Sequence, residues 1–91
     1  MTTTQCIRDA ADPLATALVS VYEAGIRVPP TDILISWTAG GCVMRVADRS
    51  STRRDEIEEA FRTAFLAAGW GVRVRNTGGL NLEHPSTLTR L

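Results

Sequence analysis

The sequence lacks the features that would place it in a membrane, in a secretory pathway or on bulk nucleic acid. It has no run of about 18 apolar residues, which a spanning helix needs. Residues 1–5 carry neither the basic region nor the apolar core of a secretory signal. Lysine is absent, and ten arginines balance ten acidic residues, so the formal net charge is zero. We therefore expect a cytoplasmic protein that is not a polycation held to phosphate by charge alone.

Cysteine and histidine are scarce, which argues against a metal site. Cys6 and Cys42 are too few for a disulfide framework, and we expect both to be reduced. Neither a C-x-x-C nor an H-x-x-x-H spacing occurs, so no metal ligand set is predicted. The glycine pairs match neither the dinucleotide-binding pattern nor the phosphate-loop pattern. The sequence therefore predicts no metal, no cofactor and no small-molecule substrate.

The single histidine does not indicate catalysis. His84 lies at the end of the last predicted strand, opposite Val72, where we expect a half-exposed structural residue. A general base would need a serine or cysteine and an orienting acid brought to it. The acidic cluster at 55–59 falls on the first turns of a helix, where acids favour the dipole and face water. The sequence thus predicts a protein that is not an enzyme.

The use of arginine without lysine has two explanations. Arginine recognises anions in a bidentate manner, which lysine does not. Codon usage in a GC-rich genome also favours arginine, and we prefer this explanation. It points to a bacterial or phage gene and says little about chemistry.

The length of 91 residues allows one domain, covering 1–91. A hydrophobic fraction of 44% and a charged fraction of 22% are typical of a globular chain. A chain this short buries a modest share of its surface, so pairing with a second copy would add stability.

The first clear helix is predicted to start at Asp12 and Pro13, as N-cap and first helical residue, and to stop at Gly25. Residues 1–11 are either a helical extension joined to it or a separate turn before the proline. The predicted buried stripe consists of Leu14, Ala17, Leu18, Val21 and Tyr22.

A second helix is predicted from a cap at Ser51 or Thr52 to Gly69, because Thr52 and Asp55 match the capping pattern. Glu58 and Arg62 have the favourable i, i+4 order on its water-facing side, beside Glu56 and Glu59. Its predicted buried stripe consists of Ile57, Ala60, Phe61, Ala64, Phe65 and Ala68.

Two hairpins complete the pattern. In residues 33–39 and 42–47 the side chains of the two predicted faces alternate. Gly40-Gly41 lies between the two segments and predicts a two-residue loop with positive φ at both glycines. The apolar face then pairs Ala39 with Cys42, Trp37 with Met44 and Ile35 with Val46, and the other face pairs Ser36 with Arg45 and Thr38 with Val43.

The second hairpin joins residues 70–75 to 80–84 through a predicted three-residue loop, Thr77-Gly78-Gly79. This loop pairs Val74 with Leu82, and Arg73 with Glu83. Pro85 stops the last strand, and residues 86–91 are expected to form a flexible tail.

The order helix, hairpin, helix, hairpin predicts an α+β, two-layer sandwich of the form α-β-β-α-β-β. Two helices would cover one face of a four-stranded, mainly antiparallel sheet, with Trp37 and Trp70 on the covered side.

Arginine gathers in the second half of the chain, where a binding surface is predicted. The strand arginines project from the uncovered sheet face, and the others lie at the start of the second helix. The candidate binding residues are Arg45, Arg73, Arg75, Arg49, Arg53 and Arg54.

Leu34, Val43 and Ala47 share the uncovered face with the strand arginines, which makes it amphipathic and favours a protein partner, the chain itself included. We therefore predict a small non-catalytic protein-binding module, such as a regulator or inhibitor encoded by a phage or mobile element, acting through the sheet face or edge. The alternative is nucleic-acid binding by the same arginines, which the lack of aromatics on that face disfavours.

Overall fold

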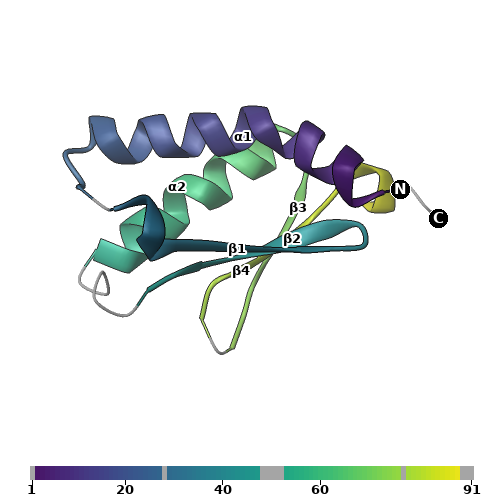
Figure 1. The fold of residues 1–91 in the computed structure, drawn as a ribbon. Helices are drawn as coiled ribbons and strands as arrows, with labels where there is room; N and C mark the ends of the chain where they lie inside the picture. Colours follow the sequence, from purple (N-terminus) through teal and green to yellow (C-terminus); the bar gives the residue numbers. More distant parts are fainter. Residues whose placement is uncertain (1, 28, 48–52, 77, 89–91) are drawn as a thin grey trace.

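The computed structural model describes residues 2–27, 29–47, 53–76 and 78–88. Two helices lie on one face of a four-stranded antiparallel sheet, in the order α-β-β-α-β-β, so the predicted two-layer α+β fold is confirmed (Figure 1). The elements are α1 (Thr3–Glu23), η1 (Pro30–Asp32), β1 (Ile33–Thr38), β2 (Gly41–Val46), α2 (Arg54–Ala67), β3 (Gly71–Val74), β4 (Leu80–Glu83) and the single-turn α3 (Pro85–Leu88).

The strands are ordered β1-β2-β4-β3, so the second strand of each hairpin lies inside the sheet and the first strand of each forms an edge. Figure 1 shows the β3–β4 hairpin curving away from the helices towards its tip. Val74, near that tip, is accordingly 71% exposed although it is on the helix side of β3.

The register of the first hairpin differs by two residues from the prediction. Thr38 pairs with Gly41, so the loop is Ala39-Gly40, with φ of 114° at Gly40. Gly41 belongs to β2, where a Cβ atom would run into the main-chain carbonyl of Leu82 on β4. The predicted faces survive because an even shift keeps each side chain on its side of the sheet. The observed pairs on the apolar face are Trp37 with Cys42, Ile35 with Met44 and Ile33 with Val46.

The second hairpin shows the same two-residue difference. Val72 pairs with Leu82 and Val74 with Leu80, and the N–H of Arg75 donates to the carbonyl of Gly79 over 3.0 Å. The turn therefore lies between Arg75 and Gly79, one residue earlier than predicted, and the predicted loop residue Thr77 lies outside the described residues. Gly79, expected in the turn, lies against β2, where its Cβ would stand 2.7 Å from Cγ of Arg45.

The helix α1 starts earlier than predicted. The hydroxyl of Thr2 caps it by accepting the N–H of Gln5 over 3.1 Å, so Asp12 is not the N-cap and residues 3–11 belong to the same helix. Pro13 lies inside the helix, where it has no N–H to donate to the carbonyl of Asp9. The buried stripe is Cys6, Ala10, Pro13, Ala17 and Val21.

Two members of the predicted α1 stripe, Leu18 and Tyr22, are exposed. The reason is packing: small residues such as Ala10 and Ala17 let α1 approach α2 closely, and the larger side chains are turned aside.

The helix α2 buries Ile57, Phe61, Ala64 and Phe65 as predicted. Ala68 is exposed, because it is the C-cap residue and no longer follows the helical stripe. The predicted caps Ser51 and Thr52 lie outside the described residues.

A series of rings crosses the core from α2 to the end of β4. Phe61 stacks on Phe65 with centroids 6.5 Å apart, and Trp70 stands edge-on to Phe65 at 5.1 Å. His84 continues the series, 5.1 Å from Trp70. Trp70 is buried and Trp37 is partly buried, both on the helix side of the sheet as predicted.

Within the described ranges, none of the helices combines the length and the apolar character needed to cross a bilayer.

We expect Gly41→Ala to lower the free energy of unfolding by about 2–3 kcal/mol, because the added methyl group must push β4 away from β2. The control is Gly69→Ala, where no atom lies within 4 Å and the cost is only that of a left-handed φ of 87°, about 1 kcal/mol. Urea unfolding of both variants measures the difference. An unchanged midpoint for Gly41→Ala would show that the two strands are not in close contact at this residue.

Candidate functional site

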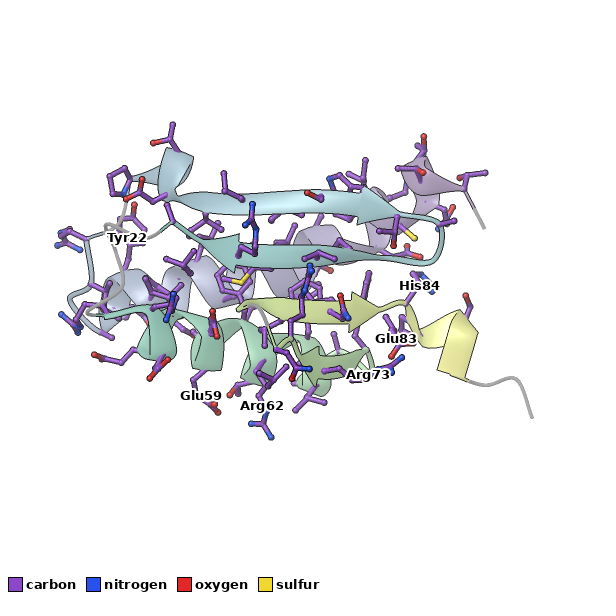
Figure 2. The ribbon with its side chains drawn as sticks, turned by 90° about the horizontal axis from the view of Figure 1, so that it is seen from below. Tyr22, Glu59, Arg62, Arg73, Glu83 and His84 are labelled. Carbon is purple, nitrogen blue, oxygen red and sulfur yellow. The ribbon has the colours of Figure 1, made fainter. Side chains whose placement is uncertain are left out.

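The sheet face opposite the helices is uncovered by any described element, and Figure 2 looks onto it. The side chains on this face belong to residues that alternate with the buried ones. They form three cross-strand rows: Thr38–Gly41–Glu83–Gly71, Ser36–Val43–Asn81–Arg73 and Leu34–Arg45–Gly79–Arg75. We call this surface the open face.

The open face carries three of the six predicted arginines. Arg45 is exposed on β2, and its stem crosses Gly79. Arg73 is 72% exposed, and its Nε and one terminal nitrogen both lie 3.2 Å from Oε1 of Glu83. The predicted Arg73–Glu83 proximity therefore holds, although the two residues are diagonal rather than directly opposite. An ion pair this exposed adds little stability and is easily exchanged for another carboxylate.

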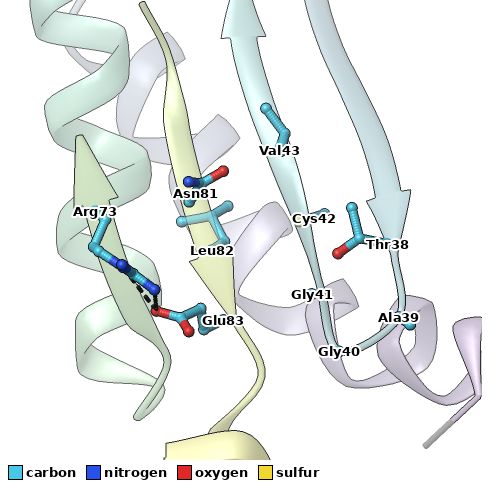
Figure 3. Close-up of a pocket in the computed structure, with 10 residues that line it drawn as sticks. All are labelled: Thr38, Ala39, Gly40, Gly41, Cys42, Val43, Arg73, Asn81, Leu82 and Glu83. Atoms are coloured by element: carbon cyan, nitrogen blue, oxygen red, sulfur yellow. Dashed lines mark hydrogen bonds and ion pairs between the residues drawn. The ribbon is translucent and has the colours of Figure 1, made fainter. Parts of the chain in front are cut away.

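A shallow hollow of about 230 Å³ lies at the end of the open face that carries the row Thr38–Gly41–Glu83–Gly71 (Figure 3). Gly41 forms its floor, and Thr38 and the Arg73–Glu83 pair stand at its sides. The hollow exists because Gly41 must lack a side chain for β2 and β4 to approach. Its walls thus offer both a cation and a carboxylate beside an apolar floor.

The other predicted arginines belong to the helix layer. Arg53, the residue before α2, forms a fork with Glu56, at 2.6 Å and 3.1 Å. These hydrogen bonds lower the pKa of Glu56 and raise that of Arg53. A carboxylate of the chain itself therefore neutralises Arg53 at this helix start. Arg54 is half-buried in the first turn, and Arg49 lies outside the described residues.

Charge pairing farther along α2 also differs from the prediction. Arg62 contacts Glu59, at 3.2 Å, rather than Glu58. Glu58 is half-buried, and its Oε2 has no hydrogen-bond partner among the described residues. Arg62 therefore lies on the helix layer and not on the open face with the strand arginines.

A polar cluster that the sequence did not predict connects the first turns of α1 with the segment that follows β4. Nε2 of His84 lies 2.6 Å from Oδ2 of Asp9, a residue 75 positions away. Nδ1 of His84 accepts the backbone N–H of Ser86 at 3.0 Å and also lies 3.0 Å from its hydroxyl. His84 is buried, not half-exposed as predicted. Because Glu83 pairs with Gly71, His84 lies next to Trp70 and not opposite Val72.

The geometry of this cluster indicates a cap, although it joins an acid, a histidine and a serine. The N–H of Ser86 occupies the lone pair of Nδ1, so the neutral ring carries its hydrogen on Nε2 and donates it to Asp9. His84 therefore acts as the N-cap of α3, with Pro85 in the first helical position. A sequence signal existed in the His-Pro-Ser order. The partner Asp9 could be found only from the fold.

Hydrogen bonds from His84 and Gln5 lower the pKa of Asp9 below its ordinary value.

In the core, burial and the nearby Cys6 raise the pKa of Cys42 to about 11, so both buried cysteines belong to the packing. Across the described stretches, no three His, Cys, Asp or Glu side chains are grouped to hold a metal ion.

No family model, no curated protein and no solved structure matches this chain. Its function must therefore be argued from the residues themselves.

The lowered pKa of Asp9 predicts a pH-dependent contribution to stability. A carboxylate whose pKa is lower in the folded chain stabilises it fully above the ordinary value of about 4, and this stabilisation is lost as the pH falls through the lowered value. We expect Asp9→Asn to be less stable than the wild type at pH 7 and to approach it near pH 2–3, as urea unfolding would measure.

The matched control is Asp12→Asn, which removes an exposed carboxylate from the same helix and so separates the loss of one negative charge from the loss of the Asp9–His84 contact. A stability loss in Asp9→Asn that is the same at every pH would contradict the assignment of the Asp9–His84 contact.

Proposed function

We propose that this chain is a small non-catalytic module that binds another protein through its open face. The observation that carries the proposal is the composition of that face, where three arginines stand beside aliphatic side chains on a surface that no described element covers. Among the described residues of this face Glu83 is the one acid, and it is already engaged by Arg73.

The chemistry of the open face supports a partner with an acidic surface. Leu34 is 41% exposed and shares its row with Arg45 and Arg75. An aliphatic side chain flanked by arginines fits a protein surface where carboxylates surround an apolar contact, since interfaces combine an apolar centre with charge-assisted hydrogen bonds at the rim. The partner is therefore expected to be acidic. A regulator or inhibitor encoded by a phage or mobile element, working in the cytoplasm, would need no more than such a surface.

Nucleic-acid binding is the less favoured reading of the same arginines. Arg53 and Arg73 are engaged by carboxylates, and the two tryptophans that could stack on bases lie on the helix side of the sheet. A zero net charge also supplies no long-range attraction for phosphate.

The non-catalytic part of the proposal rests on the cap at His84. A ring whose Nδ1 holds the N–H of Ser86 and whose Nε2–H is donated to Asp9 has both nitrogens engaged in local structure. A substrate could reach these nitrogens only after the contacts with Ser86 and Asp9 were broken.

The test is affinity capture from a nuclease-treated lysate of the native host, followed by measurement of the dissociation constant with the captured protein. We expect one acidic protein in stoichiometric amount, and an affinity reduced about tenfold or more by Arg45→Glu combined with Arg75→Glu, because reversed charges would face its carboxylates. Arg62→Glu, which reverses a charge on α2, is the control and should leave the affinity unchanged.

Two results would contradict the proposal. A captured protein that is lost equally with Arg62→Glu would not be bound by the open face. A species that is captured from an untreated lysate and disappears after nuclease treatment would establish the nucleic-acid alternative. Its affinity for nucleic acid should then fall steeply with salt, with a slope lowered by about one for each arginine removed.

A further inference from the structure

The open face carries a second shallow depression, next to the hollow at Gly41. It has a volume of about 330 Å³ and lies towards the turn that joins β3 to β4, and we call it the turn-side depression. Two guanidinium groups and two carboxamides line it, and none of its described lining residues is an acid. The lining residues are Arg73, Val74, Arg75, Asn76 and Asn81, of which Arg73 and Asn81 also border the hollow.

Arg45 brings a third guanidinium group to the border of the turn-side depression. Arg45, Gly79 and Arg75 belong to one cross-strand row, with Gly79 in the middle. Because Gly79 has no side chain, the stem of Arg45 lies over it, and a Cβ atom at Gly79 would stand 2.7 Å from Cγ of Arg45. The side chain of Arg45 therefore leans over β4 in the direction of Arg75.

The charges of these three arginines are only partly compensated. Figure 3 shows the guanidinium group of Arg73 turned towards Glu83, whose Oε1 lies 3.2 Å from it. The guanidinium groups of Arg45 and Arg75 form no hydrogen bond or ion pair with any described residue. Arg75 is nevertheless half-buried, so it has lost part of its hydration without gaining a carboxylate. Three guanidinium groups against one carboxylate leave an excess of two positive charges.

We infer that the turn-side depression binds a phosphoryl group, carried by a phosphorylated serine or threonine of the partner protein. This inference rests on the proposed function and names the kind of acid that the open face recognises. A phosphate monoester carries about 1.5–2 negative charges at neutral pH and three acceptor oxygens, which matches two uncompensated cations with forked donors. A carboxylate has one charge and two oxygens, so it would leave one of the two arginines uncompensated. The shallow depression suits the short side chains of phosphoserine and phosphothreonine.

The surroundings of the cluster favour a single phosphoryl group over a nucleic-acid backbone. A backbone brings a further phosphate with every nucleotide and needs cations along its whole path. On the described open face, the carboxylate of Glu83 lies on one side of the cluster, and the 41% exposed Leu34 lies beyond Arg45. A protein that carries one phosphoryl group can continue onto this apolar side chain, whereas a second phosphate would find no described cation there.

The first test is a titration of the ¹⁵N-labelled protein with two blocked tripeptides, Ala-phosphoserine-Ala and Ala-Glu-Ala, followed by NMR. We expect the phosphopeptide to shift the Nε–H signals of Arg73 and Arg75 and the side-chain NH₂ signals of Asn81. Its affinity should exceed that of the glutamate peptide by about tenfold or more, because it places more charge and more acceptor oxygens among the same donors.

Arg75→Gln should lower the affinity for the phosphopeptide by about tenfold or more, because it removes a charged fork from the site. This variant is expected to fold, since the side chain of Arg75 forms no hydrogen bond or ion pair with the described residues, and urea unfolding checks it. The control is Arg62→Gln, which removes an arginine of α2 and should leave the affinity unchanged.

The pH dependence of binding reports the charge of the ligand. Arginine stays protonated throughout, whereas a phosphate monoester gains its second charge with a pKa of about 6. The affinity for the phosphopeptide should therefore rise several-fold from about pH 5.5 to about pH 7.5, relative to that for the glutamate peptide. A titrating group of the protein would affect both peptides alike.

Equal affinity for the two tripeptides would overturn the inference, as would unshifted Arg75 signals at up to about 10 mM phosphopeptide. An oligonucleotide that displaces the phosphopeptide and binds more tightly with each added nucleotide would also overturn it, because the ligand would then be a nucleic-acid backbone.

Phosphatase treatment of the captured partner separates this inference from the proposed function. Loss of binding after dephosphorylation supports the phosphoryl site. Unchanged binding that still depends on Arg45 and Arg75 would overturn the phosphoryl site alone and leave the proposed function in place.

Discussion

The contact between β2 and β4 is the constraint on which the rest of the structure depends, because it alone joins the two hairpins into one sheet. It requires two residues without side chains, Gly41 near one end of the contact and Gly79 near the other, at points where a Cβ would meet the backbone of the neighbouring strand. Once β2 and β4 are central, β1 and β3 must be edges. The hollow on the open face and the unpaired edge of β1 both follow from this single arrangement.

The same glycines explain how far the sequence could predict the sheet. Period-two alternation assigned the buried and open faces correctly, because it depends only on which residues are apolar. The pairing register was wrong by two residues in both hairpins, because a Gly-Gly pair suits a turn and Gly41 and Gly79 were assigned to one. Their actual role is a close approach between strands from different hairpins, which no local pattern reveals. The even error left Arg45 and Arg73 on the predicted face.

Two quantities limited what could be predicted for the helices and the polar contacts. They are the size of the side chains on α1 and the separation along the chain of residues that contact each other. The predicted α1 stripe was correct for Ala17 and Val21 and wrong for Leu18 and Tyr22. These two side chains have more apolar surface than alanine, but close helix packing prefers smaller residues. The contact between Asp9 and His84 joins residues too far apart for a sequence pattern. The sequence thus identified the arginines but could not tell which already had carboxylate partners.

The two cysteines give a means of observing the motions of this fold. Cys6 on α1 and Cys42 on β2 are both buried between the layers. The thiol of Cys42, whose pKa burial raises to about 11, is also almost entirely protonated at neutral pH. An alkylating reagent, which attacks the thiolate, can therefore modify the chain only after the helix has separated from the sheet. The rate of labelling would report how often the two layers part, without any engineered probe.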